Sequence, residues 1–270
     1  MINRNVYIGS VDILGYRNVE SRLKQLPEKE SEALMTRTIE HLQQIIDDFM
    51  EKSKSIKWIK YGDGFVCYSQ YDAAHNLDQI VKQNCRLIAL ALQASIPLRV
   101  AITQNEIHIQ NDESGTAITG EGWNILKEIG KSLDWMGGLL FLPNYDRTHQ
   151  ETIRDLIKST HLVIKQNSVA EVSFNPPFKQ ELRFSTERTW LLNWQRLLHV
   201  SKPQVDNKIR NWWGYIPQYL SLNDSDDVRR KQENAIAFAD YCRSLNQAAK
   251  LIFFSGVDPR LPIDEIDGFE

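Results

Sequence analysis

The first hundred residues alternate between short apolar runs and longer stretches whose apolar side chains recur every three or four positions. The short runs are typical of strands, and the longer stretches are typical of amphipathic helices. Residues 6–11 form one such run, which ends at Asp12. The pattern predicts strands at residues 6–11, 56–59, 65–68 and 97–102, and helices over residues 33–52 and 73–94.

This order of elements, strand-helix-strand-strand-helix-strand up to about residue 103, is the split βαβ arrangement of ferredoxin-like folds. The predicted fold class is therefore α+β. Its two helices cover one face of an antiparallel sheet, which leaves the other face free for a partner subunit. Downstream, the pattern predicts strands at residues 106–109, 116–119 and 138–142, and a helix from Trp123 to about Leu133.

Beyond residue 145 the pattern changes to shorter apolar runs and Trp-rich segments. Without a low-complexity linker or an internal repeat, we interpret residues 1–145 as one domain and residues 146–270 as a mainly helical extension packed on it. In this extension the pattern predicts strands at residues 162–165 and 169–174, and helices over residues 186–200, 204–220 and 226–249.

The composition narrows the possible partners and compartments. The 270 residues are 42% hydrophobic and carry a net charge of −3 with a pI near 6.1, so no basic surface for nucleic acid is expected. The three cysteines are far apart and lack metal spacing, which indicates a reduced setting. The apolar runs are too short to span a bilayer, and the N-terminus is polar. We expect a soluble, cytoplasmic protein without a membrane partner.

Two aspartates stand out. Asp63 lies in Gly62-Asp63-Gly64 between two strand runs. The Asp63-Gly64 pair is a strong signal for a two-residue hairpin of type I′, which needs φ > 0 at both central positions. Asp12 follows the first strand, and a hairpin beside that strand would bring the two carboxylates together. Such hard oxygen ligands suit Mg²⁺ or Mn²⁺ holding a triphosphate. The structural alternatives are a plain turn for Asp63 and a helix cap for Asp12.

Three segments in order resemble the catalytic domain of class III nucleotide cyclases. Asp12-Ile13-Leu14-Gly15-Tyr16 resembles the first metal motif, Tyr61-Gly62-Asp63-Gly64-Phe65 the hairpin with the second metal aspartate, and Leu98-Arg99-Val100-Ala101-Ile102 the central strand. Gly120-x-x-Trp123-Asn124 matches the start of a later motif. Together they cover residues 6 to about 142.

The sequence differs from this family at positions that recognise the base and at a position that stabilises the transition state. Ile59 and Ala117 occupy positions where purine cyclases place a Lys and an Asp that read the base, and Glu128 stands where the family has an Arg. Three stretches look like bacterial pyrimidine cyclases of anti-phage defence, which make cyclic UMP or cyclic CMP for a separate effector protein: residues 11–15, 132–137 and 229–235.

The resemblance implies a cytosolic homodimer whose composite active sites convert a pyrimidine nucleoside triphosphate, UTP in preference to CTP, to the cyclic nucleotide and pyrophosphate. Asp12, Asp63 and the carbonyl of Ile13 would bind two Mn²⁺ or Mg²⁺ ions. Leu14, Gly15 and Tyr16 would contact the phosphates, and Ile59 and Ala117 the base. Asn124 would orient the ribose, with Lys127 or Arg99 as candidate cations for the transition state. A divergent purine cyclase and a catalytically silent cyclase-like domain are the alternatives.

Overall fold

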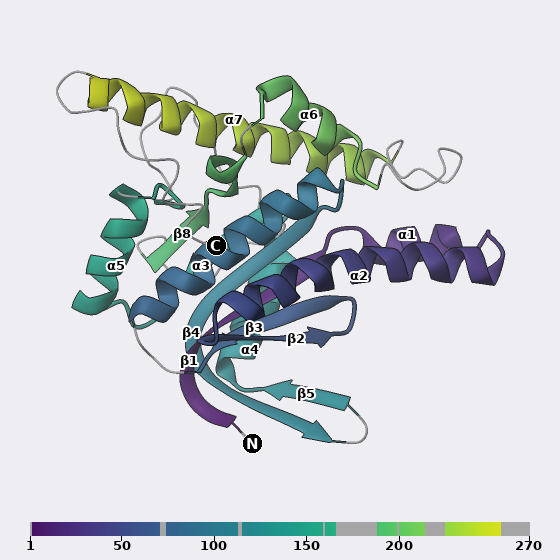
Figure 1. The fold of residues 1–270 in the computed structure, drawn as a ribbon, viewed down its shortest axis with the longest axis horizontal. Helices are drawn as coiled ribbons and strands as arrows, with labels where there is room; N and C mark the ends of the chain where they lie inside the picture. The colour runs from purple at the N-terminus through teal and green to yellow at the C-terminus, as the bar shows by residue number, and fades with distance from the viewer. Residues whose placement is uncertain are drawn as a thin grey trace.

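Helices pack on both faces of a long, twisted mixed sheet in the computed structural model (Figure 1). The structure describes residues 2–70, 74–112, 115–158, 160–165, 188–198, 200–213 and 225–254. In this part of the chain the sheet has eight strands, seven of them in the order β2-β3-β1-β4-β6-β8-β7, with β5 paired to β4. Within the same residues, no helix is long and apolar enough to cross a bilayer.

The first four strands form the predicted split βαβ unit. They are antiparallel and adjacent in the order β2-β3-β1-β4. The connections β1 to β2 and β3 to β4 contain helices, as this arrangement requires. The bounds are β1 Ile2–Ile13, α1 Tyr16–Leu23, α2 Glu28–Lys52, β2 Ile56–Tyr61, β3 Gly64–Ser69, α3 Ala74–Gln93 and β4 Leu98–Asp112. The α+β fold class predicted from the sequence is confirmed.

Helices α2 and α3 cover one face of this sheet, in front of the strands in Figure 1. The contact with α3 is close at Gly9, where a β-carbon would lie 2.7 Å from Cys67 Sγ and 3.5 Å from Asn84 Nδ2 of the helix. A buried hydrogen bond of 2.9 Å from the Trp58 indole to Gln83 of α3 adds to this packing. We call this the α3 face.

Helix α4, Glu121–Ser132, packs on the opposite face, which we call the α4 face. Its Gly122 lies against the side chains of Asn105 and Ile107 of β4. Because neighbouring residues of a strand point to opposite sides, Asn105 and Ile102 lie on different faces. The second half of β4 pairs with β5, Gly115–Thr119. Part of the face expected to be free for a partner is therefore covered by the chain itself.

The chain beyond residue 136 continues the same sheet. β6, Gly137–Phe141, runs parallel to β4, and β8, Thr189–Leu192, joins β6 and β7, Val163–Lys165. The helix predicted for residues 186–200 is wrong: residues 189–192 form β8, and a 3₁₀ helix follows at Trp194–Leu197. Because every residue of β8 is buried, its continuous apolar run lacks the period that separates strand from helix.

Three helices complete the described part: α5 Arg147–Lys158, α6 Lys202–Arg210 and α7 Asp226–Phe254. Helix α5 was not predicted, and α6 ends ten residues before the predicted Leu220. The start of α7 agrees with the prediction. The strand predicted for residues 169–174 lies outside the described residues.

The three cysteines are free and buried, so the expected absence of disulfides is confirmed. Burial raises the pKa of the Cys67 thiol to about 12, with a smaller opposing effect from Asn84, so this thiol stays neutral at physiological pH.

Candidate functional site

The register between β1 and β3 brings Asp12 and Asp63 together at the C-terminal end of β1. Asp12 pairs with Gly64, and Asp63 directly precedes Gly64 in the turn of the β2–β3 hairpin. On its other side Asp12 pairs with Arg99 of β4. The hairpin thus lies beside β1, as expected from the sequence, and both aspartates are half-exposed.

Gly64 is what allows this approach. A β-carbon at this position would lie 2.0 Å from the carbonyl oxygen of Val11, far inside van der Waals contact. Because Tyr61 pairs with Gly64, the two central residues of the turn are Gly62 and Asp63 instead of the expected Asp63 and Gly64. Of these two only Gly62 has a positive φ, 60°, so the predicted type I′ turn is wrong, although the hairpin itself is confirmed. The glycines on both sides of Asp63 therefore serve different purposes: Gly62 makes the turn, and Gly64 brings the turn against β1.

Asp12 is held by Arg99. The guanidinium donates to the same carboxylate oxygen from Nε, at 3.0 Å, and from Nη2. Its Nη1 donates to the carbonyl oxygen of Leu133, at 3.2 Å, where α4 ends. With 19% of the Arg99 side chain and 36% of the Asp12 side chain exposed, the pair is partly shielded from water. The structure thus places Arg99, expected as a transition-state cation, on the carboxylate itself.

The turn after β1 leads into α1 with free backbone donors. Gly15 stands at the N-cap with a φ of 82° and provides no side-chain cap. The first N–H groups of a helix have no partner within the helix, and the helix dipole favours an anion there. Leu14 is buried and its N–H donates to Pro97 O at 2.9 Å, which fixes the turn on the sheet.

Tyr16 lies between this turn and the hairpin. Burial raises the pKa of its phenol, and the negative charges of Glu20 and then Asp63 raise it further. The side chain of Tyr16, the first residue of α1, therefore senses the charge of Asp63. Asp12, Asp63 and the first turn of α1 form one half-open site.

The residues of this site fit a divalent metal that is shared with a ligand. Within the described residues there is no group of three or more His, Cys, Asp or Glu side chains that could hold a metal alone. Mg²⁺ is commonly held by one or two carboxylates plus phosphate oxygens and water, so Asp12 and Asp63 suffice. Ile13 has a buried side chain, so only its backbone carbonyl could add a ligand.

The two residues expected to contact the base lie on different strands. Ile59 of β2 pairs with Val66, two residues from Gly64, and so shares the face of Asp12. It is half-buried. Ala117 is exposed on β5, opposite Gln110, which lies eleven positions after Arg99 along β4. The pairing of the strands does not bring Ala117 to Asp12 within one chain.

Asn124 and Lys127 lie on the outer side of α4. Trp123 and Leu126 of this helix are buried against the sheet, and the Trp123 ring packs edge-on to Tyr61 at a centroid distance of 5.0 Å. Asn124 and Lys127 are exposed. The Lys127 Nζ lies 5.8 Å from the Trp123 ring centroid. Both side chains therefore point away from the sheet that carries Asp12 in their own chain.

The C-terminal part of the chain supports the site at two points, through side chains to which the sequence assigned no role. Trp213, buried after α6, has its indole nitrogen 3.7 Å from the position of a β-carbon on Gly15. Arg230 of α7 forms an ion pair with the buried Asp134 (Nε–Oδ2 2.9 Å), next to Leu133. Asn234 donates to the Asp134 carbonyl at 3.1 Å.

These contacts join two stretches that the sequence had singled out separately. Residues 132–137 and 229–235 both resembled pyrimidine cyclases, and they touch in the structure. Leu133, in the first of these stretches, accepts a hydrogen bond from Arg99, and Arg99 donates in turn to Asp12. In the sequence, only the resemblance of both stretches to the same proteins pointed to a contact between them, because an ion pair between residues 96 positions apart leaves no local pattern.

Gly64→Ala is expected to destabilise the protein. The added methyl group collides with the Val11 carbonyl, and overpacking of this kind costs about 1–3 kcal/mol. Gly130→Ala in α4 is the matched control, because its β-carbon would meet no atom within 4 Å and alanine favours the helix. Urea unfolding measures both. A Gly64→Ala protein as stable as the wild type would contradict the close approach of β3 to β1.

No protein-family model and no curated protein matches the chain. Solved structures of similar fold include the adenylyl cyclase CyaB from P. aeruginosa, 11% identical with a TM-score of 0.45 over 71% of this chain and 96% of that chain. The guanylyl cyclase domain of the RhoGC fusion protein from the fungus Blastocladiella emersonii is 10% identical, with a TM-score of 0.46 over 71% and 98%. An adenylate cyclase from Trypanosoma brucei is 12% identical, with a TM-score of 0.45 over 70% and 87%. At such low identity the likeness concerns the fold alone.

Proposed function

We propose that this protein is a metal-dependent nucleotide cyclase that converts a pyrimidine nucleoside triphosphate, UTP in preference to CTP, to the 3′,5′-cyclic nucleotide and pyrophosphate. The observation that carries the proposal is the juxtaposition of Asp12 and Asp63 beside the uncapped N-terminus of α1. Two carboxylates next to free backbone N–H groups suit a triphosphate and its metal ions.

Different residues of the chain would bind the metal ions, bind the phosphates and position Asp12. Asp12, Asp63 and the Ile13 carbonyl would hold two Mn²⁺ or Mg²⁺ ions, which lower the pKa of the attacking ribose hydroxyl and neutralise the leaving pyrophosphate. The N–H groups of Gly15 and Tyr16 would orient the β- and γ-phosphates, with Leu14 fixing the turn. Arg99 holds Asp12 in place, and its guanidinium would supply positive charge to a triphosphate bound at this carboxylate.

The remaining functional groups would come from a second chain. Asn124 and Lys127 are exposed on the outer side of α4, which supports assigning them to the site of a partner subunit. In such a homodimer, Asn124 orients the ribose and Lys127 supplies charge at the α-phosphate.

The preference for a pyrimidine rests on the side chains at the base positions. Ile59 is half-buried on the same face as Asp12, and Ala117 is apolar as well. Neither can donate or accept a hydrogen bond, so the purine edge would find no polar partner at either position. By the resemblance in residues 132–137 and 229–235, the cyclic product would signal to a separate effector protein in anti-phage defence.

One observation favours a catalytically silent domain as the second candidate. Arg99 donates twice to Asp12 and would compete with a metal ion for the same oxygen. Glu128, where the family has an Arg, points to the same alternative. Such a domain would bind a nucleotide or a protein partner without turnover.

Turnover of the four nucleoside triphosphates decides among these readings. With Mn²⁺, we expect cyclic UMP as the main product by mass spectrometry, cyclic CMP at a lower rate, and ATP and GTP as poor substrates. A kcat/KM for ATP or GTP at or above those for UTP and CTP would return the protein to the purine cyclases. No cyclic product from any of the four would favour the silent domain.

Asp12→Asn and Asp63→Asn are each expected to reduce turnover by about three orders of magnitude or more, because a shared metal site supplies several kcal/mol to the transition state. Both should also weaken Mn²⁺ binding, measured by electron paramagnetic resonance in the presence of a non-hydrolysable UTP analogue. Asp47→Asn, on the exposed side of α2, is the matched control for loss of one carboxylate. Unchanged Mn²⁺ affinity in both site variants would contradict the metal assignment.

Mixed subunits test the composite site. Asp63→Asn chains and Asn124→Ala chains should each be inactive alone. Their heterodimer contains one intact site of two, so statistical mixing of a two-fold symmetric dimer should restore up to about a quarter of wild-type turnover. Native mass spectrometry verifies that heterodimers form. Heterodimers without activity, or a wild-type protein that remains monomeric, would contradict the arrangement.

A further inference from the structure

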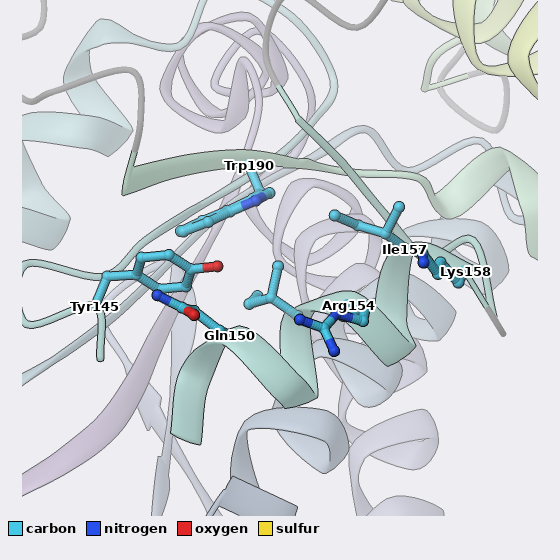
Figure 2. Close-up of a pocket in the computed structure, with 7 residues that line it drawn as sticks. Tyr145, Gln150, Arg154, Ile157, Lys158 and Trp190 are labelled. Carbon is cyan, nitrogen blue, oxygen red and sulfur yellow. The ribbon is translucent and has the colours of Figure 1, made fainter. Parts of the chain in front are cut away.

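A second pocket lies far from the aspartates, between α5 and β8 (Figure 2). It has a volume of about 290 Å³, close to the lower limit of roughly 300 Å³ for small-molecule sites. Its walls come from α5, from Tyr145 just before that helix and from Trp190 of β8. A ligand of modest size would fill it.

The sheet separates this pocket from the candidate active site. Trp190 pairs with Leu140 of β6, which pairs with Ile102 of β4. Residues paired across strands share a face, so Trp190 lies on the α3 face, to which Ile102 belongs. Asp12 lies on the α4 face. A ligand in this pocket could not reach Asp12 or Asp63 of the same chain.

One side of the pocket is aromatic. The rings of Tyr145 and Trp190 lie 4.9 Å apart between centroids and are tilted by 52° to each other. In Figure 2 the Tyr145 hydroxyl points into the space between Trp190 and α5. Burial raises the pKa of this phenol, with an opposing effect from the charge of Arg154, so the hydroxyl stays protonated and can donate a hydrogen bond.

The other side is polar and positively charged. Gln150, Arg154 and Lys158 recur every four residues along α5 and therefore share one side of the helix. All three are exposed, and no ion pair involves Arg154 or Lys158 within the residues that the structure describes. The acidic residues Glu151 and Asp155 do not line the pocket, although each lies three residues before one of the two cations. Two unpaired cations thus flank an aromatic wall.

We propose that this pocket binds a nucleotide with a single phosphate group. The base would lie against the half-buried ring of Tyr145, since aromatic side chains stack on every nucleobase, and the buried Trp190 supports that ring from behind. Gln150 offers both a donor and an acceptor to the edge of a heterocyclic ring. Arg154 can hold phosphate oxygens with a bidentate geometry, and Lys158 adds a point charge. The site does not depend on the cyclase activity proposed above.

Calorimetric titration of the full chain tests this site. We expect 5′-UMP to bind with a Kd below about 1 mM, at least tenfold more tightly than uridine or inorganic phosphate. Equal affinity for uridine would overturn the role of the cations, and equal affinity for phosphate would overturn the role of the rings. No heat from 5′-UMP would overturn the site. Titration with 3′,5′-cyclic UMP separates two sources: tighter binding than 5′-UMP supports a cyclic ligand, and weaker binding supports a linear one.

Variants locate the binding. Arg154→Ala/Lys158→Ala should weaken 5′-UMP binding at least tenfold without changing the melting temperature, because both side chains are exposed. Arg147→Ala/Lys29→Ala removes the same charge elsewhere, with Arg147 on α5 but 94% exposed, and should bind as the wild type does. Asp12→Asn should also retain binding. Loss of binding in Asp12→Asn, or full affinity in Arg154→Ala/Lys158→Ala, would place the nucleotide elsewhere and overturn the proposal.

Discussion

The backbones of β1 and β3 approach each other so closely at Gly64 that a side chain there would overlap the Val11 carbonyl. This contact sets the pairing of Asp12 with Gly64 and so brings Asp63, one residue earlier in the turn, to the end of β1. A shift of one residue would send the side chain of Asp12 to the opposite face of the sheet, because side chains alternate along a strand. The candidate metal site therefore depends on backbone geometry more than on any side-chain bond between the two aspartates.

The end of the chain contributes to this site without entering it. Arg230 and Asn234 of α7 hold Asp134, and the neighbouring Leu133 carbonyl accepts a bond from the Arg99 that holds Asp12. An ion pair with one buried partner is sensitive to the loss of either member, since the remaining charge is left without compensation. Helix α7 thus braces the junction between α4 and β6, and through it the orientation of Arg99.

The sheet keeps two kinds of chemistry apart. Its α4 face carries Asp12, Arg99 and the Tyr61–Trp123 contact, whereas its α3 face carries the pocket of Trp190, Arg154 and Lys158. β8 makes the second site possible, since it adds Trp190 beside β6 and beneath α5. The extension is thus part of the sheet as well as a cover for it, and any signal between the two sites would have to pass through the strands.

Local pattern alone determined the split βαβ unit, the Gly62-Asp63-Gly64 hairpin and the start of α7, because period and turn chemistry are properties of neighbouring residues. The tertiary structure decided that residues 189–192 form a strand, since a run buried on all sides shows no period. It also decided that Arg99 holds Asp12 and that Arg230 holds Asp134, 87 and 96 residues away along the chain. Such partners are chosen by strand register and helix packing, which bring distant segments together and leave no mark in the local sequence.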